Sequence, residues 1–265
     1  MKNPLRVNLL DRRLTIGGWI QIGHPACAEV LAGAGFDWLC VDLEHGAIDL
    51  ETTANIFRAI DAFDCVPVAR LPANDPVWIH RVLDAGARGL IIPMVNSAEE
   101  AEAAVKQAKY PPRGVRGYGY SRANRHGMAF KESIGEANDE IAMIMQIEHH
   151  RAIDALDDIL SVDGVDGLFI GPLDLSGSMG ITGQLDHPRM QEAMCAFRDA
   201  CQRHGKAAGF HVVRPTQPAI ATALGQKYSL VALGLDNVFM EMAGSAAIQT
   251  CREFQQKRGL KKLAA

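Results

Sequence analysis

The sequence predicts an α/β fold in which eight parallel strands close into a (β/α)8 TIM barrel. Its 265 residues match the roughly 250 residues of one such barrel. Short apolar runs alternate with longer amphipathic segments, which is the pattern of a parallel sheet buried on both faces. Eight such runs are present, whereas an open doubly wound sheet usually has about five or six strands. We therefore expect one barrel domain over residues 1–265.

The expected strands follow one another along the chain at 18–22, 38–41, 66–69, 89–93, 142–147, 167–170, 207–210 and 230–233. Amphipathic segments that would cover the outside of the barrel lie at 50–63, 76–85, 98–109, 153–160, 190–204, 218–224 and 238–257. One interval breaks this rhythm, because residues 110–138 separate the fourth and fifth strands. We expect a turn at 110–114 and a short helix at 130–138, in a loop whose length is typical of functional or mobile segments.

Composition and charge narrow the class of partner. The net charge of −4 and the pI near 6.1 provide no basic field for nucleic acid or anionic lipid. No run approaches the ~18 apolar residues of a membrane span, and residues 1–10 lack the apolar core of a signal peptide. The six cysteines form no C-x-x-C pair and are too sparse for a disulfide scaffold. We expect a cytoplasmic protein with reduced cysteines and small-molecule partners.

Polar residues follow several of the expected strands at the point where each strand ends. The second strand runs into Asp42-Leu43-Glu44-His45, and the third runs into Arg70. Gln146 and Glu148 come at the end of the fifth strand, and Asp174 follows the sixth. Because the active site of an α/β barrel forms at the carboxyl ends of its strands, these side chains are expected to converge on one rim.

Glu148 and Asp174 both leave an apolar setting at this rim. Two carboxylates completed by water suit an oxygen-preferring divalent ion such as Mg2+ or Mn2+. Each could instead be a helix N-cap or an ion-pair partner, but their joint placement favours a metal site. Arg70 could hold a carboxylate or a developing enolate, or form a structural salt bridge with a rim acid. Gln146 could orient a substrate or fill a polar layer of the barrel.

The positions of the histidines and lysines indicate which side chains could act as a base, bind zinc or form a Schiff base. His45 could take a proton near neutral pH, although eight other histidines weaken that signal. His149 and His150 directly follow Glu148 and suggest zinc, but adjacent side chains diverge, so we interpret them as surface or helix-start residues. None of the lysines ends an expected strand, which disfavours a Schiff base.

The glycines offer no nucleotide site. The Gly33-Ala34-Gly35 turn lacks a complete dinucleotide fingerprint, and the chain contains no P-loop. We expect Gly33 and Gly35 to close a helix before the second strand. The sequence therefore predicts no nucleotide cofactor. Together with the positions of the lysines, this favours a metal ion as the electrophile.

Several blocks in the same order and spacing resemble the HpcH/HpaI aldolase family over residues 16 to 254. The blocks are GFDW (35–38), DLEH (42–45), RLPANDP (70–76), PMV (93–95), YPPRGVRG (110–117), QIE (146–148) and GVDGLFIGPLDLS (164–176). The resemblance implies a phosphoenolpyruvate/pyruvate-type barrel and a class II pyruvate aldolase. Such an enzyme reversibly cleaves a 4-hydroxy-2-keto acid to pyruvate and an aldehyde.

The resemblance also implies roles for individual residues. Glu148 and Asp174 would bind the divalent ion, which is Mg2+ or Mn2+ with Co2+ as a further candidate. The 2-keto acid would be oriented by residues around the sixth strand and by one fifth-strand amide, namely Gln146, Gly171, Pro172 and Leu173. Arg70 would stabilise negative charge on the reacting oxygen. His45 would act as a base through water, and Asp84 would raise its basicity.

Other implications concern assembly and reaction type. Family members resemble one another in forming hexamers, as trimers of dimers, with the last helix exchanged between neighbours; the apolar segment 238–254 suits that role or docking on its own barrel. Residues 118–127 differ from the family loop, and their arginines could address an aldehyde or form a subunit contact. Leu43 and Gly46 also depart from the pattern of the sugar-acid aldolases. Irreversible synthesis from the same enolate, or oxaloacetate decarboxylation, is the alternative reaction.

Overall fold

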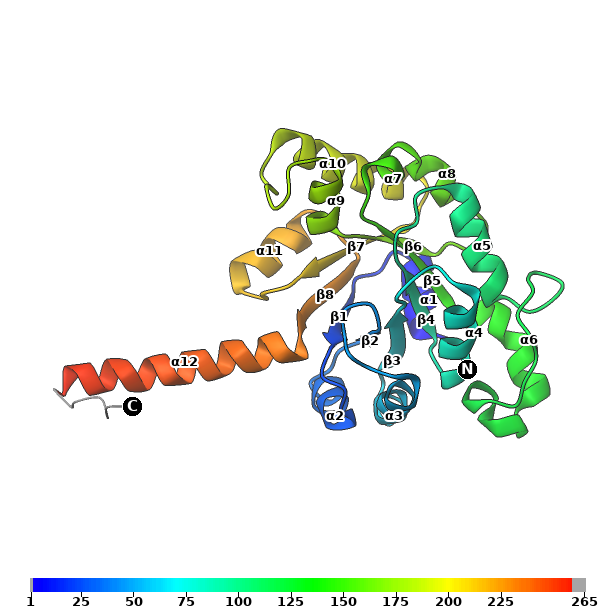
Figure 1. Ribbon diagram of the computed structural model, residues 1–265, viewed down its shortest axis with the longest axis horizontal. Helices are drawn as coiled ribbons and strands as arrows, with labels where there is room; N and C mark the ends of the chain where they lie inside the picture. The colour runs from blue at the N-terminus through cyan, green and yellow to red at the C-terminus, as the bar shows by residue number, and fades with distance from the viewer. Residues whose placement is uncertain (1, 259–265) are drawn as a thin grey trace.

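Eight parallel strands close into a barrel in the computed structural model, which describes residues 2–258 (Figure 1). Each strand pairs with its neighbours in chain order, and β1 pairs with β8. The strands are β1 (Thr15–Ile20), β2 (Trp38–Asp42), β3 (Val66–Arg70), β4 (Gly89–Ile92), β5 (Ala142–Ile147), β6 (Gly167–Ile170), β7 (Ala207–Val212) and β8 (Leu230–Leu235). The predicted barrel is confirmed. β1 begins earlier than expected, because Thr15 already pairs with Leu230 of β8. It also ends earlier, because the backbone N–H of Ile22 donates to the Asp236 side chain instead of a neighbouring strand.

Helices alternate with the strands and cover the outside of the barrel (Figure 1). They are α1 (Pro4–Leu10), α2 (Pro25–Gly33), α3 (Leu50–Ile60), α4 (Pro76–Ala85), α5 (Ala98–Ala108), α6 (Phe130–Glu140), α7 (His150–Asp154), α8 (Leu156–Ser161), α9 (Pro172–Ser178), α10 (Pro188–Arg203), α11 (Gln217–Gly225) and α12 (Asp236–Lys257), with a 3-10 helix η1 (Arg122–Gly127). The helix expected at 153–160 is divided at Ala155, which is the C-cap of α7. The sequence patterns did not indicate α1 and α9, although both begin with the proline that often opens a helix.

Side chains alternate along each strand between two apolar layers. Those that face inward form one cluster, which includes Trp19, Trp38 and Phe169, and Leu5 and Leu9 of α1 belong to the same cluster. Those that face outward pack against the helices in a second, larger cluster. Such burial stabilises the fold by roughly 1.5–3 kcal/mol for each large apolar side chain.

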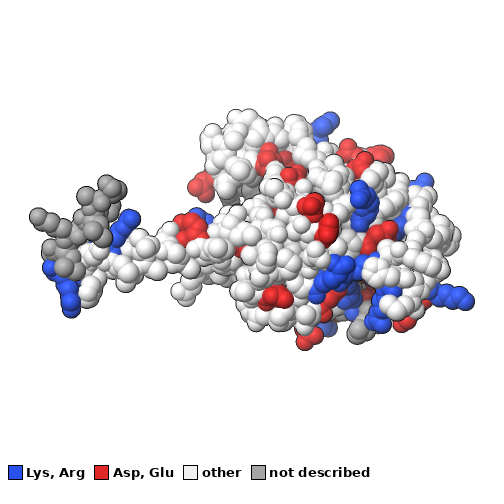
Figure 2. All heavy atoms as spheres, turned by 60° about the horizontal axis from the view of Figure 1, so that its bottom comes forward, with Lys and Arg blue, Asp and Glu red and all other residues white. Residues whose placement is uncertain are grey.

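The last helix does not lie on the barrel. α12 extends away from the body, and its one buried residue is Asp236 (Figures 1 and 2). Figure 2 also shows acidic and basic side chains interspersed over the body, as the small net charge implies. None of the helices in residues 2–258 combines the length and apolar character that crossing a membrane requires.

Candidate active site

Arg70 lies at the carboxyl end of β3, held by Asp42, the last residue of β2, and by Glu44 after it. Its Nε and Nη2 donate to Asp42 Oδ1 and Oδ2 at 2.9 and 2.7 Å, and its Nη1 lies 3.1 Å from Glu44 Oε2. Burial alone would raise the pKa of Asp42, but hydrogen bonds and charge from Arg70 outweigh it and lower the pKa. Burial raises the pKa of Glu44. The forked contact fixes the guanidinium plane in the mouth of the barrel.

Trp19 lies beside this guanidinium. The Arg70 Cζ atom lies 4.4 Å from the centroid of the Trp19 ring, which is a cation–π distance. The indole Nε1 is buried and has no hydrogen-bond partner in residues 2–258. Trp19 therefore packs against the charged cluster of Arg70, Asp42 and Glu44.

Glu148, which follows β5, is a second buried acid at this mouth. It is only 4% exposed, and its Oε1 accepts the Met94 N–H at 2.7 Å while its Oε2 accepts Gln146 Nε2. Burial raises the pKa of Glu148; the Gln146 and Met94 hydrogen bonds oppose this rise, and the nearby charge of Asp174 adds to it. A bound cation would remove this penalty, because it would favour the ionised carboxylate.

Gly171 makes this packing possible. A Cβ atom at position 171 would lie 2.9 Å from Glu148 Cβ and 3.0 Å from Glu148 Oε2. After Gly171, Pro172 opens α9, which places Leu173 and the exposed Asp174 in its first turn. The sequence thereby brings Asp174 within electrostatic range of Glu148.

A divalent cation fits these side chains. Residues 2–258 contain no cluster of three or more His, Cys, Asp or Glu side chains that could hold a metal ion. Two carboxylates are nevertheless enough when substrate oxygens and water complete the shell, as is usual for Mg2+ and Mn2+. Gln146 Oε1 is also buried without a hydrogen-bond partner in the described part of the chain, so the mouth holds a polar atom that lacks its ligand.

His45 and Asp84 lie at opposite ends of the barrel. His45 follows β2, is exposed, and has Nε2 at 3.9 Å from Glu44 Oε2. Asp84 lies near the end of α4, which runs back from the mouth toward the start of β4, and it accepts a 2.8 Å bond from Arg116. The structure of one chain therefore brings together Arg70, Gln146 and Glu148 with the Gly171–Asp174 segment, but not His45 with Asp84.

Two further predictions concern residues around the site. His149 is the N-cap of α7, where its Nδ1 accepts the Arg151 N–H at 3.2 Å, and His150 is the first residue of that helix. Both are helix-start residues, as expected. The segment 118–127 lies between α5 and β5 and thus at the amino-terminal end of the barrel, where Arg122 pairs with Asp61 and donates to Ala85 O. Its arginines do not face the mouth of their own chain.

Sequence reasoning missed two inward-facing residues near this rim, Trp19 and His211. Both belong to strands whose bounds were predicted wrongly. The first strand was predicted to begin at residue 18 instead of Thr15, and the seventh to end at Phe210 instead of Val212. The strict inward–outward alternation of barrel strands was the signal that could have found them.

Comparison with known proteins gives a consistent result. The model of a family described as HpcH/HpaI aldolase/citrate lyase matches residues 15–241. A 4-hydroxy-2-oxo-heptane-1,7-dioate aldolase of Salmonella paratyphi C (strain RKS4594) is 39% identical over 93% of this chain and 93% of its own. A 4-hydroxy-2-oxovalerate aldolase of Rhodococcus jostii (strain RHA1) is 38% identical over 92% of this chain and 94% of its own. An HpcH/HpaI aldolase/citrate lyase family structure from Burkholderia cenocepacia J2315 has a TM-score of 0.91 at 35% identity, covering 95% of this chain and 100% of its own.

Proposed function

Because the chain belongs to the HpcH/HpaI aldolase/citrate lyase family, we propose that it is a metal-dependent class II aldolase. It reversibly cleaves a 4-hydroxy-2-keto acid to pyruvate and an aldehyde. The observation that carries the proposal is a buried carboxylate, Glu148, which lies within electrostatic range of both Asp174 and the Arg70 guanidinium. The same mouth can hold a cation and an oxyanion, which are the two charges that a keto acid and its enolate require.

Glu148 and Asp174 would hold the divalent cation, for which Mg2+ and Mn2+ are the first candidates and Co2+ the next. When bound, the cation supplies Lewis-acid polarisation of the keto-acid carbonyl. Gln146 and the backbone of Gly171 to Leu173 orient the keto acid against these carboxylates. Gly171 has no side chain that would block this approach.

Arg70 stabilises the negative charge that develops on the reacting oxygen. Asp42 fixes its fork before substrate arrives, so little reorganisation is needed during the reaction. In the cleavage direction the 4-hydroxyl loses its proton, the C3–C4 bond breaks, and its electron pair enters the enolate of pyruvate. His45 takes the proton through a water molecule and is exposed enough to return it to solvent.

Asp84 can support His45 only if it comes from another copy of the chain, because the two residues occupy opposite ends of one barrel. The exposed α12 supports such an assembly, since Met240, Ile248 and Phe254 are each more than half exposed on it. A homo-hexamer, built as a trimer of dimers with α12 packed on a neighbour, would cover these side chains. Light scattering at several protein concentrations tests this; a monomer with full activity would contradict the role of Asp84.

The names of the relatives do not agree on which aldehyde the reaction releases. The name of one relative specifies a heptanedioate and that of the other a valerate, so their aldehyde products differ in length and charge. Leu43, which is buried, departs from the sugar-acid pattern and does not decide between them.

The experiment is pyruvate release from 4-hydroxy-2-oxovalerate and 4-hydroxy-2-oxo-heptane-1,7-dioate, before and after chelation and after addition of Mg2+, Mn2+ or Co2+. We expect activity to disappear with chelator and to return with metal. Unchanged activity, or a pyruvate adduct trapped by borohydride, would contradict the metal route. Decarboxylation of oxaloacetate without retro-aldol cleavage would instead favour a synthase or decarboxylase on the same site.

A further inference from the structure

His211 lies in the mouth of the barrel, at the end of β7. Along this strand Ala207 belongs to the inner apolar cluster, whereas Ala208 and Val212 belong to the outer one. Alternation therefore turns His211 inward, and Phe210 outward toward Tyr228. The ring of His211 lies 5.5 Å from that of Trp19, centroid to centroid, and Trp19 also contacts Arg70. His211 and Arg70 thus contact the same aromatic side chain, Trp19, and Arg70 is the residue proposed above to stabilise the reacting oxygen.

One ring nitrogen of His211 is fixed by the backbone. Nε2 lies 3.1 Å from the carbonyl oxygen of Gly234 on β8. A carbonyl oxygen can only accept, so Nε2 carries the hydrogen and Nδ1 carries a lone pair. Burial lowers the pKa of His211 to about 4, with the Arg70 charge acting in the same direction. The ring is therefore neutral at neutral pH.

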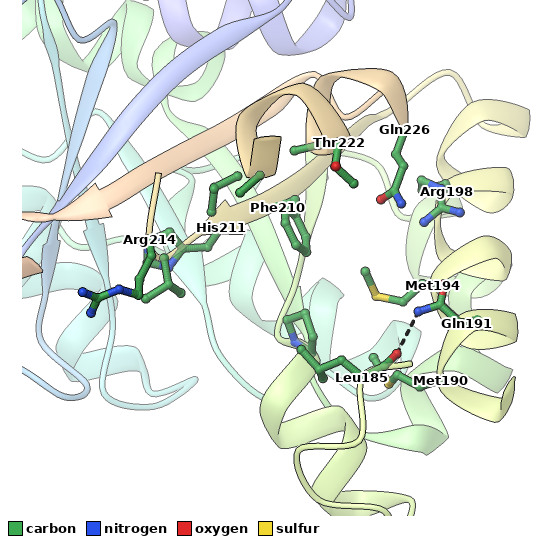
Figure 3. Close-up of a pocket in the computed structure, with 15 residues that line it drawn as sticks. Leu185, Met190, Gln191, Met194, Arg198, Phe210, His211, Arg214, Thr222 and Gln226 are labelled. Atoms are coloured by element: carbon green, nitrogen blue, oxygen red, sulfur yellow. Dashed lines mark hydrogen bonds between the residues drawn. The ribbon is translucent and has the colours of Figure 1, made fainter. Parts of the chain in front are cut away.

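The other ring nitrogen has no protein partner. In residues 2–258 no donor hydrogen-bonds to Nδ1, and this atom is not one of the unpaired atoms that are sealed from solvent. The cavity of about 360 Å³ in Figure 3 lies between β7, α10 and α11, on the side to which Phe210 points, so it is not the space that the inward-facing ring of His211 enters. Figure 3 shows His211 on the Arg214 side of Phe210, away from Met194. A lone pair is thus available on a ring that packs beside Trp19, which in turn contacts Arg70.

We propose that His211 is a specificity-determining residue whose Nδ1 accepts a hydrogen bond from a hydroxyl group on the aldehyde half of the substrate. The inference rests on the aldolase function proposed above and adds the substrate class, which is hydroxyaldehydes. A neutral acceptor repels a carboxylate, and an alkyl chain would bury Nδ1 without a partner. A hydroxyl donor matches it, and the loss of such a bond changes selectivity more than the loss of a methylene contact does.

The test compares two aldehydes of equal size, glycolaldehyde and propionaldehyde, as acceptors for pyruvate in the presence of Mn2+. The readout is the ratio of their kcat/KM values, which cancels effects common to both. We expect His211→Leu to lower this ratio roughly 3- to 10-fold, mainly through the KM of glycolaldehyde, as the loss of one neutral hydrogen bond predicts. His211→Asn places an amide oxygen near the position of Nδ1 and should restore most of the ratio.

A control and a separate assay make the result decisive. His204→Leu changes a histidine at the end of α10 that pairs with Asp157 and should leave the ratio as in the wild type. If His211→Leu does not fold, the comparison of His211→Asn with His211→Ala replaces it. An equal loss for both aldehydes, or no change, would overturn the hydroxyl acceptor and leave a packing role. Deuterium exchange into the pyruvate methyl group of the wild type separates the two levels: exchange with an unaltered ratio refutes only the role of His211, whereas no exchange refutes the aldolase and this inference together.

Discussion

The two ends of the barrel use buried polar groups differently. At the amino-terminal end, Asn3 donates to Arg88 O and Glu140 O at 2.7 and 2.6 Å, and Arg6 pairs with Asp166 at 3.1 Å. Lys109, which is 1% exposed, donates to Asn138 O at 2.6 Å. These polar groups satisfy one another within the chain.

At the carboxyl end, buried polar atoms are left over. Gln146 Oε1 and Trp19 Nε1 have no hydrogen-bond partner in the described residues, and Glu148 keeps a raised pKa. Within residues 2–258, unpaired neutral atoms also occur at the amino-terminal end, among them Thr15 Oγ1 and Trp38 Nε1, so the two ends differ in how they hold a buried acid.

Asp166 pairs with Arg6, whereas Glu148 accepts only neutral donors within residues 2–258. A buried acid without an ion pair indicates a place where a cation would complete the structure. The comparison indicates that polar groups at the amino-terminal end stabilise the fold, whereas those at the carboxyl end are available for binding and chemistry, as in other barrels of this type.

Arg116 is another incompletely paired polar group at the amino-terminal end. It is 3% exposed, pairs with Asp84, and has an Nε without a hydrogen-bond partner in residues 2–258. A buried polar atom without a partner in the described residues also occurs in the mouth, at Gln146 Oε1.

The largest effect is expected for Glu148→Gln, which removes one of two proposed metal ligands but keeps the volume. Lewis-acid catalysis contributes several kcal/mol, so turnover should fall more than about 1,000-fold. Titration calorimetry with Mn2+ should show the loss of binding, and a melting curve should show a folded protein. Normal metal binding by this variant would disprove the assignment.

Arg70→Lys should have the next largest effect. The ammonium keeps the positive charge but cannot form the fork to both Asp42 oxygens, so the oxyanion donor is misplaced. We expect kcat to fall roughly 100- to 1,000-fold, as for the loss of one oxyanion donor, with metal affinity nearly unchanged. Steady-state kinetics and metal titration together check this. A fall in metal affinity as large as that in kcat would argue for a structural role.

Asp166→Ala tests the other end of the barrel. Asp166 is 1% exposed and accepts both Arg6 Nε at 3.1 Å and the Met143 N–H at 2.9 Å. Its removal leaves two donors without an acceptor and should cost about 3 kcal/mol of unfolding free energy. Urea denaturation at fixed protein concentration measures this. Metal affinity should stay as in the wild type, and a large change in it would break the proposed division between the two ends.

The strands were predictable because burial on both faces makes each of them a continuous apolar run. The prediction placed Arg70, Gln146, Glu148 and Asp174 at the carboxyl end of the strands, where the structure has them, for the same reason. His211 was missed because a polar residue at the end of β7 looks like the beginning of a loop. Only the three-dimensional alternation shows that it faces inward.

Asp84 shows a different limit. Its position near the end of α4 already implies the amino-terminal end of the barrel, since a helix after a parallel strand must run back. The family resemblance supplied a role for it without the geometry. That role now depends on an interface between copies, which no single-chain pattern encodes.

Gly171→Ala should have a smaller effect at the mouth. The new Cβ would meet Glu148 at 2.9 to 3.0 Å, so the carboxylate or the start of α9 must shift by a few tenths of an ångström. Displacing a metal ligand in this way resembles the loss of a supporting contact, and we expect metal affinity to fall roughly 10- to 100-fold. Gly177→Ala, which changes a glycine later in α9 whose Cβ would be no closer than 3.7 Å to its nearest neighbour, is the matched control. Equal affinities for the two variants would show that Glu148 has more freedom than its contacts imply.

The smallest effect concerns pH at the amino-terminal end. Burial lowers the pKa of Lys109 from 10.5 to about 8, although the Asp166 charge opposes the shift. Between these two values the unfolded chain binds a proton that the folded chain does not, so this residue makes stability rise with pH, by at most about 1.4 kcal/mol per pH unit. Lys109→Met removes the titrating group and should flatten the stability curve over that interval relative to the wild type. Urea denaturation across the interval measures both slopes, and identical slopes would mean that Lys109 keeps its proton when buried, paired more strongly by Asp166 than its contacts indicate.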